Sequence, residues 1–311
     1  MKALEKTSAR KKLSAREWFY KYLNPFFNSP YVLVAPAAIL SIIFSVYPVG
    51  YTFVNSLYYW DTMKDIKRFV GFDNYTSIFK DAEFLRSLSN TATYTLIYVI
   101  VGLTLAILCA VFLFRSNWMY QFVQGVVFTP HIVSWVSITM MWMWLMDPRS
   151  GMLNFVLGLV GIEPLKWMVD EKTSLASVIL VAVWKQMGYS VTIAIAGLKG
   201  IPPYIYEAVR LDKSNSLRTF FKITIPMLSP TLLFLLVTSF IDSFCAFDTV
   251  YLMTKGGPRG SSNILVHWIY QMGFEYFRTG ESMAASVVLL FIIGFVSVLN
   301  FTVLNKKVHY Q

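Results

Sequence analysis

The sequence predicts an all-α, polytopic membrane protein with six transmembrane helices and both termini in the cytoplasm. Of its 311 residues, 56% are hydrophobic and only 14% are charged, which is too apolar for an ordinary soluble protein of this length. The apolar runs are continuous rather than alternating, which disfavours a β-barrel. Aromatic residues make up 17% of the chain, and several stand near the ends of apolar runs, where their rings favour the lipid headgroup zone.

A bilayer core about 30 Å thick requires roughly 20 apolar residues of helix. Windows of about that length occur at 31–56, 91–113, 121–146, 175–198, 231–252 and 283–304. The first window is too long for the apolar region of a cleaved signal peptide, and more spans follow it, so we expect a retained helix. The chain is accordingly divided into a cytoplasmic N-terminal arm, 1–30, and a transmembrane domain, 31–311.

The distribution of basic residues predicts the orientation of these spans. The segments on one side of the predicted membrane, termini included, carry 15 Lys and Arg residues, and the longer loops on the other side carry 11. Cytoplasmic segments near spans have an excess of Lys and Arg, so both termini and the loop 199–230 are expected in the cytoplasm. We interpret the net charge of +10 as this topology signal and an attraction to anionic membrane lipid, not as nucleic-acid binding.

Residue patterns for chemistry are missing from the sequence. It has no phosphate-binding loop of the G-x-x-x-x-G-K-[ST] type, so we expect no ATP binding by this chain. Its three histidines are scattered, and its two cysteines, Cys109 and Cys245, lie inside apolar stretches without metal-ligand spacing. The sequence therefore predicts no enzyme activity, no catalytic residue, no metal site and no cofactor in this chain.

The loop 199–230 is the most informative segment. Pro202 and Pro203 can open a helix, which we expect to run from Tyr204 to Asp212 with Glu207 in its first turn, where the helix dipole favours a carboxylate. A polar turn follows, and a second short helix is expected over 217–225, ended by Pro226. Two such helices could fit a groove in a soluble partner, although a plain solvated loop between spans remains open on these residues alone.

A series of motifs runs in one order along nearly the whole chain. They are Phe69-Val70-Gly71-Phe72-Asp73-Asn74-Tyr75, Asn90-Thr91, Trp184-Lys185, Gly188, Gly197-Leu198, Ile201-Pro202, Glu207-Ala208-Val209, Asp212, Phe221, Ile223-Thr224-Ile225-Pro226, Pro230, Phe247-Asp248, Tyr251 and Thr254-Lys255-Gly256-Gly257-Pro258. With these motifs the chain resembles the permease subunits of maltose-type, binding-protein-dependent ABC importers, and its loop 199–230 resembles their EAA loop.

This resemblance implies a permease subunit in a bacterial cytoplasmic (inner) membrane. Its expected partners are a second homologous permease, two ATPase subunits that hold ATP and Mg, and an extracytoplasmic solute-binding protein. The implied function is import of a carbohydrate, in particular an oligosaccharide, by alternating access; glycerol phosphate esters are a lesser alternative. The rival from another class is an ion-coupled secondary transporter, which would work without an ATPase, and a non-transporting membrane scaffold is a third.

The resemblance also implies that the loop couples to the ATPase. The residues expected at this contact are Glu207, Ala208, Asp212, Lys213 and Pro226. Lys213 stands where the family usually has glycine, which reaches positive φ freely. We therefore expect either a different turn, with Asn215 in the left-handed conformation, or an unusual ATPase partner. Our hypothesis is that Lys213 adds a contact to the ATPase surface.

Ionisable and aromatic groups inside the predicted spans are the candidates for a substrate pathway, namely Asp242, Lys185, Trp142 and Asp248. Charged groups within spans are costly and by default face a cavity or a partner. For Lys185 and Asp248, a structural ion pair or a helix cap is as good an explanation as a substrate contact. For Asp242, the alternative to a place in the cavity is a hydrogen bond to a serine or to the backbone. Four tryptophans could stack on a sugar ring or anchor the membrane interface, namely Trp142, Trp144, Trp135 and Trp184. An anionic sugar is conceivable through Lys185.

Overall fold

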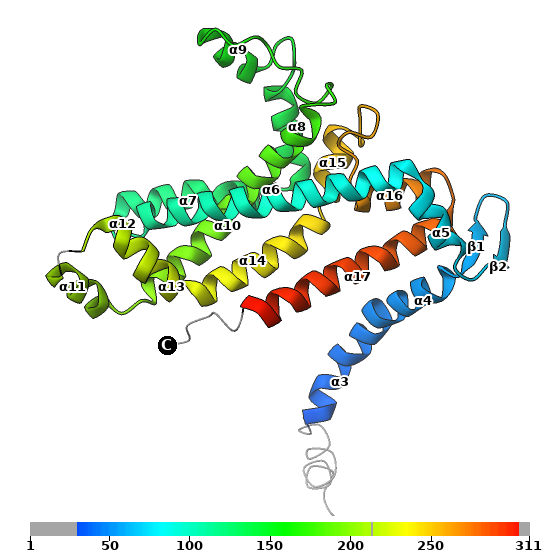
Figure 1. Cartoon of the computed structure of the whole chain (residues 1–311), viewed down its shortest axis with the longest axis horizontal. Coiled ribbons are helices and arrows are strands. Elements are labelled where there is room, and N and C mark those ends of the chain that lie inside the picture. The colour runs from blue at the N-terminus through cyan, green and yellow to red at the C-terminus, as the bar shows by residue number, and fades with distance from the viewer. Residues whose placement is uncertain (1–29, 213, 305–311) are drawn as a thin grey trace, which may run out of the picture. The chain divides into compact units, whose positions relative to one another are not determined.

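The computed structural model describes residues 30–212 and 214–304, and it divides at Val54 and Asn55 into two compact units (Figure 1). The first unit is an apolar helical segment made of α3 (Pro30–Ser41), η2 (Ile42–Val46) and α4 (Tyr47–Asn55). A single π-helical turn, η2, interrupts it, and its 26 residues are long and apolar enough to cross a membrane. The predicted window 31–56 is therefore helical throughout this unit. The N-terminal arm lies outside the described residues, apart from Pro30.

The second unit begins with a hairpin of two antiparallel strands, β1 (Tyr58–Asp61) and β2 (Ile66–Phe69). The short helix α5 (Asp73–Lys80) follows, and then the long helix α6 (Ala82–Leu113). The carboxylate of Asp81 caps α6 by accepting the first backbone N–H groups of the helix. Because of this cap, α6 begins nine residues before the predicted window 91–113.

The third predicted span, 121–146, is not one straight helix. It forms α7 (Trp118–Ile132) and α8 (Trp135–Leu145), which meet at a bend of 100°. Pro130 weakens the helical hydrogen-bond ladder just before the bend, and the Ser134 hydroxyl caps α8 by accepting from the Ser137 N–H. The continuous apolar pattern hides this break.

The fifth predicted span, 231–252, is also interrupted. The helix α14 (Ser229–Phe244) ends in a tightened turn, in which the Cys245 N–H bonds the Asp242 carbonyl, and α15 (Phe247–Met253) starts after Ala246. The other elements of the unit outside the loop after α10 are α9 (Met152–Leu159), α10 (Ser174–Lys199), α16 (Leu265–Tyr270), η4 (Gln271–Glu275) and α17 (Thr279–Leu304).

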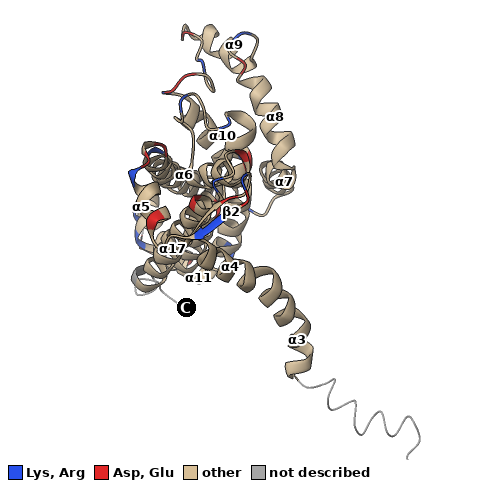
Figure 2. Ribbon diagram, turned by 90° about the vertical axis from the view of Figure 1, so that its right-hand side faces the viewer, with Lys and Arg blue, Asp and Glu red and all other residues tan. Residues whose placement is uncertain are grey.

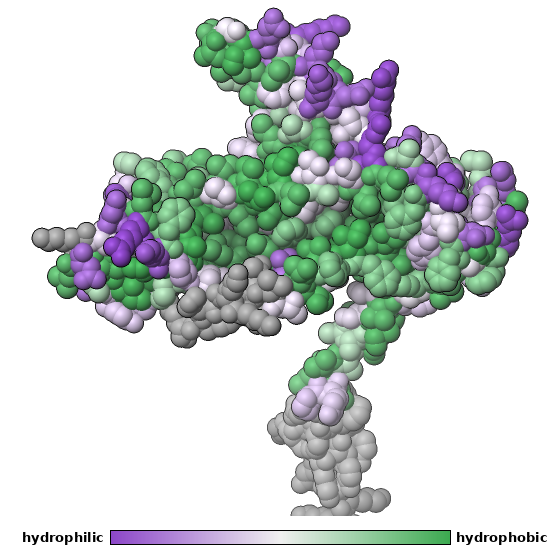
Figure 3. Space-filling model, viewed as in Figure 1, coloured by the Kyte–Doolittle hydropathy of each residue, from purple (hydrophilic) through white to green (hydrophobic). Residues whose placement is uncertain are grey.

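Among the described residues, four helices are each long and apolar enough to cross a membrane. The number rises to six if two bent pairs each count as one span, namely α7 with α8, and the helical segment Ser216–Met227 with α14, which meet at 71°. The four are the segment 30–55, α6, α10 and α17 within 279–302. Figure 3 shows a broad apolar surface over the long helices of the second unit, with hydrophilic residues gathered toward its ends. Figure 2 shows the same separation, because most charged ribbon segments lie in loops and short elements. The chain is therefore a mostly helical, multi-pass membrane protein.

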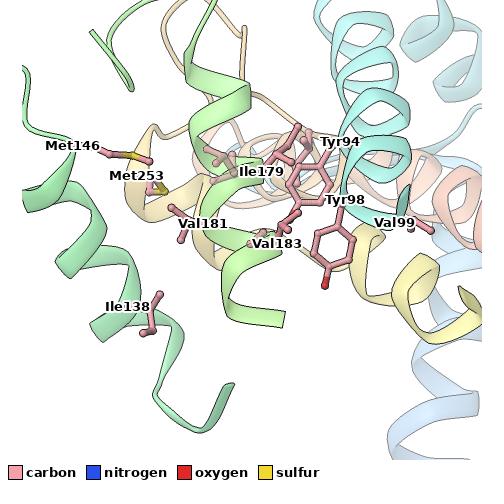
Figure 4. Close-up of a cluster of buried hydrophobic side chains, with 13 residues drawn as sticks. Tyr94, Tyr98, Val99, Ile138, Met146, Ile179, Val181, Val183 and Met253 are labelled. Atoms are coloured by element: carbon pink, nitrogen blue, oxygen red, sulfur yellow. The ribbon is translucent and has the colours of Figure 1, made fainter. Parts of the chain in front are cut away.

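The helix α10 is the centre of the second unit and packs against α6 and α7. One buried cluster joins α6, α8, α10 and α15 around Tyr94, Ile138 and Val181 (Figure 4). A second joins α6, α10 and α14, and a third joins α5, α6, α16 and α17. At Gly188 of α10, an added Cβ would lie 2.3 Å from the carbonyl oxygen of Val127, so glycine permits the close approach of α7.

Several of the family-like motif residues fasten the loops at one end of the bundle. The Asn74 amide donates to two backbone carbonyls of the segment 56–58, at 2.7 and 2.8 Å. The Asn90 amide donates to two carbonyls of the segment 260–263, at 2.9 and 2.8 Å, and the Thr91 hydroxyl accepts from a backbone N–H beside them at 2.8 Å. Motifs far apart in sequence therefore meet because each supplies partners that the other's backbone needs.

Candidate functional site

A polar and aromatic cavity of about 420 Å³ lies among six helices of the second unit. Its walls come from α6, α7, α8, α10, α14 and α15 and from the junction before α15. The lining residues are Tyr94, Tyr98, His131, Trp135, Gln186, Tyr189, Thr238, Asp242, Cys245, Ala246, Phe247, Asp248 and Thr249. Hydroxyl, amide and carboxylate groups thus converge beside aromatic rings, which is the usual composition of a small-molecule site.

Asp242 and Asp248, two of the predicted pathway residues, both line this cavity. The Gln186 amide donates to Oδ2 of Asp242 across a distance of 3.2 Å, which links α10 to α14. Asp248 occupies the first turn of α15, where the helix dipole favours a carboxylate. The structure therefore brings together the two predicted carboxylates, which lie on successive helices.

Lys185 has a different environment from the one a solute contact would need. Its ammonium donates to the backbone carbonyls of Pro130, His131 and Val133 at 3.0, 3.1 and 2.6 Å. The side chain is buried, with only 4% of its surface exposed. Helix ends leave carbonyl groups without intrahelical partners, and Lys185 supplies donors to them at the break between α7 and α8. In this structure it caps the break, and a helix cap was one of the explanations open from the sequence, beside an ion pair and a substrate contact.

Trp142 does not line the cavity. Its ring packs edge-on against Trp184, with the ring centroids 5.3 Å apart, at the border of the buried cluster of Figure 4. Trp135 lies in the cavity wall instead, and its ring also covers the Lys185 ammonium, which is 4.8 Å from the ring centroid. Of the four tryptophans weighed for sugar stacking, Trp135 lines the cavity, whereas Trp142 and Trp184 pack against each other. Trp144 is exposed on α8.

The cavity contains polar residues that the sequence reasoning did not select. Tyr94 and Tyr98 stand four residues apart on α6, and their rings stack with centroids 5.7 Å apart. Gln186 and Tyr189 occupy α10, and Thr238 stands one helical turn before Asp242. Polar residues repeating at three- or four-residue spacing within an apolar window were the signal that could have found them.

The second candidate region is the loop between α10 and α14. It contains α11 (Pro203–Leu211), α12 (Ser216–Thr219), the π-helical turn η3 (Phe220–Thr224) and α13 (Ile225–Met227). A hydrogen bond of 3.3 Å between the Tyr206 and Thr224 hydroxyls joins α11 to η3. A cavity of about 640 Å³ separates this loop from the neighbouring ends of α6 and α10. The two predicted short helices are present.

Glu207, Ala208 and Asp212 are all exposed on and just after α11, where a partner protein could reach them. Glu207 lies in the second turn of α11, because the helix begins at Pro203, so the expected contact with the first-turn dipole is absent. Lys213 lies outside the described residues. These placements leave the predicted ATPase contact as a prediction.

Two details of the predicted loop are wrong. Pro226 does not end the second helix, which continues through α13 to Met227. The π-helical turn η3 changes the hydrogen-bond register directly before the proline, so the missing N–H is tolerated in the first turn of α13. Asn215 is not left-handed either: it has φ −67° and ψ 144°, and its side chain caps α12 by accepting from the Leu217 N–H.

Long apolar helices around a polar cavity, with an exposed helical loop between two of the cavity helices, define a membrane transport subunit. The chain belongs to the family described as "Binding-protein-dependent transport system inner membrane component", whose model matches residues 102–310. It is therefore a transport component of a multi-pass membrane assembly.

Relatives match almost the whole chain. The sn-glycerol-3-phosphate transport system permease protein UgpA of Agrobacterium fabrum is 32% identical over 90% of this chain and 96% of its own length. UgpA of Escherichia coli O157:H7 is 31% identical over 93% of this chain and 99% of its own length. A chain of a bacterial alginate ABC transporter, crystallised with an alginate pentasaccharide-bound periplasmic protein, has the same fold with a TM-score of 0.79. That likeness has 20% identity and covers 94% of this chain and 99% of the other.

Proposed function

We propose that this chain is one of two permease subunits of an ATP-driven importer and that it carries an oligosaccharide across the bacterial inner membrane by alternating access. Six spans, with both bent pairs counted, and cytoplasmic termini fit this proposal. A second homologous permease completes the pathway, two separate ATPase subunits hold ATP and Mg, and an extracytoplasmic binding protein delivers the solute. The carbohydrate cargo is supported by the named cargo of the alginate transporter and by the hydroxyl-rich cavity.

One observation carries the proposal: the loop that contains α11 is flanked directly by the two helices that hold the Gln186–Asp242 bond. Movement of α11 by a docked ATPase would displace α10 and α14, and with them two walls of the cavity. In alternating access, helices must transmit the movement of the ATPase as rigid bodies to the binding site within the membrane. No comparison supports the ion-coupled secondary transporter.

The test is purification of the chain from native membranes in mild detergent, followed by identification of stoichiometric partners and an ATPase assay. We expect a second permease and an ATPase to co-purify. The variant Glu207→Lys should lose the ATPase or reduce solute-stimulated hydrolysis at least tenfold, because it reverses an exposed charge on α11. Glu163→Lys, a charge reversal in the exposed segment between α9 and α10, is the matched control.

Two results would contradict this proposal. A Glu207→Lys complex that behaves like the Glu163→Lys control would remove α11 from the coupling contact. A chain that purifies alone and drives uptake until an ion gradient is dissipated would instead be a secondary transporter.

A further inference from the structure

The cavity described above has a one-sided charge. Asp242 and Asp248 contribute carboxylates, whereas none of the described residues that line it is Lys or Arg. The ammonium of Lys185, beside the cavity residue Trp135, is held by three backbone carbonyls and covered by the Trp135 ring. Because those carbonyl dipoles and the ring already engage this cation, it does not offer a free donor to a ligand in the cavity.

The exposed carboxylate of Asp242 sets the chemistry of a complementary ligand. An ionised carboxylate only accepts hydrogen bonds, and Gln186 occupies one of its oxygens, so the remaining acceptor positions suit a ligand that donates. The Thr238 hydroxyl donates its proton to the Phe234 carbonyl and can accept from a ligand, and the Gln186 amide oxygen is a further acceptor beside Asp242. Trp135, Tyr189 and Phe247 line the same space and are half-buried, which leaves apolar ring surface for the carbon face of a sugar.

An anionic ligand would be repelled in this cavity. A carboxylate or phosphate group in this cavity would lie near two like charges in a site partly shielded from water, where repulsion is stronger than in bulk water. The sn-glycerol-3-phosphate and alginate systems, to which the chain is similar, are named for anionic cargo. Anionic cargo requires cationic groups in its binding site, and none of the described residues that line this cavity is Lys or Arg.

We propose that this chain's part of the pathway takes an uncharged, hydroxyl-rich saccharide whose hydroxyl groups donate to Asp242, and that it disfavours sugar acids and sugar phosphates. The inference rests on the proposed function, because it names the cargo class of the same cavity. It also replaces the anionic sugar that Lys185 made conceivable in the sequence.

The experiment uses the complete importer with its binding protein in proteoliposomes at pH 7. The probe is a mixture of di- to pentasaccharides from a neutral galactan and from polygalacturonate, with chitosan oligomers as the cationic set and sn-glycerol 3-phosphate added. Mass spectrometry identifies what accumulates when ATP is supplied. We expect members of the uncharged set to accumulate at least tenfold over the anionic set.

The second measurement asks whether Asp242→Asn lowers or raises the uptake of solute. For an uncharged sugar, the variant loses a charged acceptor, so uptake at subsaturating solute should fall about tenfold, while Asp242→Glu should keep most of it. Glu163→Gln is the control for loss of one exposed carboxylate. The elution profile and the thermal unfolding of the purified complex verify that each variant folds.

The outcomes separate this inference from the function on which it rests. Accumulation of the anionic or cationic set, or uptake that rises or stays within twofold in Asp242→Asn, overturns the uncharged-cargo inference and leaves an importer. Accumulation of no saccharide and no glycerol phosphate, with ATP hydrolysis intact, overturns the proposed carbohydrate import itself.

Discussion

Replacement of Lys185 by methionine tests whether this residue holds the α7–α8 break or contacts the solute. The change leaves an unbranched side chain one heavy atom shorter and removes three hydrogen bonds to carbonyl groups. A hydrogen bond to a charged group contributes about 1.5–3 kcal/mol, and a buried acceptor left without a partner costs about 1–3 kcal/mol. Neighbouring bonds do not add independently, so we expect a loss of about 3 kcal/mol.

Such a loss corresponds to a factor of about 150 in the equilibrium for local opening. Hydrogen exchange of the peptide containing residues 128–137, measured in the purified complex, reports this opening directly. We expect the amides around the bend to lose protection by roughly that factor. Lys199→Met removes an exposed lysine from the same helix and should leave the peptide unchanged.

The refuting result is specific. If Lys185→Met keeps the protection of this peptide and the thermal stability of the complex, yet raises the KM for solute, then the lysine is a substrate contact. In that case the geometry of the three carbonyl bonds would not describe the transporting state.

Three further perturbations have defined outcomes. Gly188→Val places a branched side chain against the backbone of α7, so assembly yield and thermal stability should fall, with a cost of about 3 kcal/mol or more; unchanged stability would contradict the close packing. Asn90→Ala removes one hydrogen-bond donor from each of two loop carbonyls, so limited proteolysis of the segment 254–264 should accelerate, corresponding to about 2 kcal/mol. Burial lowers the pKa of His267 to about 4 from 6.5. Because only the unfolded state then binds a proton between these values, the free energy of unfolding is at its full value above pH 6.5 and falls toward pH 4, with a loss of about 2 kcal/mol at pH 5. Thermal unfolding at pH 7.5 and 5 should show this loss, and His267→Gln should remove it.

The sign of the His267 effect follows from its hydrogen bonds. The Asn263 amide donates to Gln271 at 2.9 Å, so the oxygen of Asn263 faces the His267 ring and Nδ1 must carry the proton. The other ring nitrogen, Nε2, is buried without a hydrogen-bond partner, and a second proton there would bring an unpaired charge into the fold. Protonation of His267 therefore favours the unfolded state.

The sequence predicted the helical content, the apolar segments and the short helices of the loop, because each depends on local pattern. Asp242 and Asp248 could be placed near a cavity because ionisable groups inside spans rarely face lipid. The bend between α7 and α8 could not be located, because it depends on Lys185 in another helix as well as on Pro130 and Ser134. The sequence does not show which backbone carbonyls lie near Lys185, so its role as a cap could not be assigned from the sequence.

Two tryptophans, Trp142 and Trp135, are a second case in which the sequence alone could not assign roles. Trp142 and Trp135 are seven residues apart in one apolar window, and composition gives no reason to separate them. The bend after Ile132 and the position of α10 put Trp142 against Trp184 and Trp135 against the cavity. Tertiary packing, not residue type, decides which ring is available to a ligand.

The contact between α10 and α14 next to the loop bears on how movement would pass to the cavity. At Gly197, an added Cβ would lie 2.4 Å from the Thr231 hydroxyl oxygen and 2.7 Å from a methyl group of Leu228, so the two helices are closely packed there. The buried cluster that joins α10 and α14 continues from there as far as Leu235, whereas at the cavity the two helices are joined by the hydrogen bond from Gln186 to Asp242. Closely packed contacts resist deformation, whereas a single exposed hydrogen bond is exchanged for water at small net cost. In the proposed mechanism, the two helices therefore separate at the cavity while they stay together at the loop, so that rotation about the Gly197 contact opens the site.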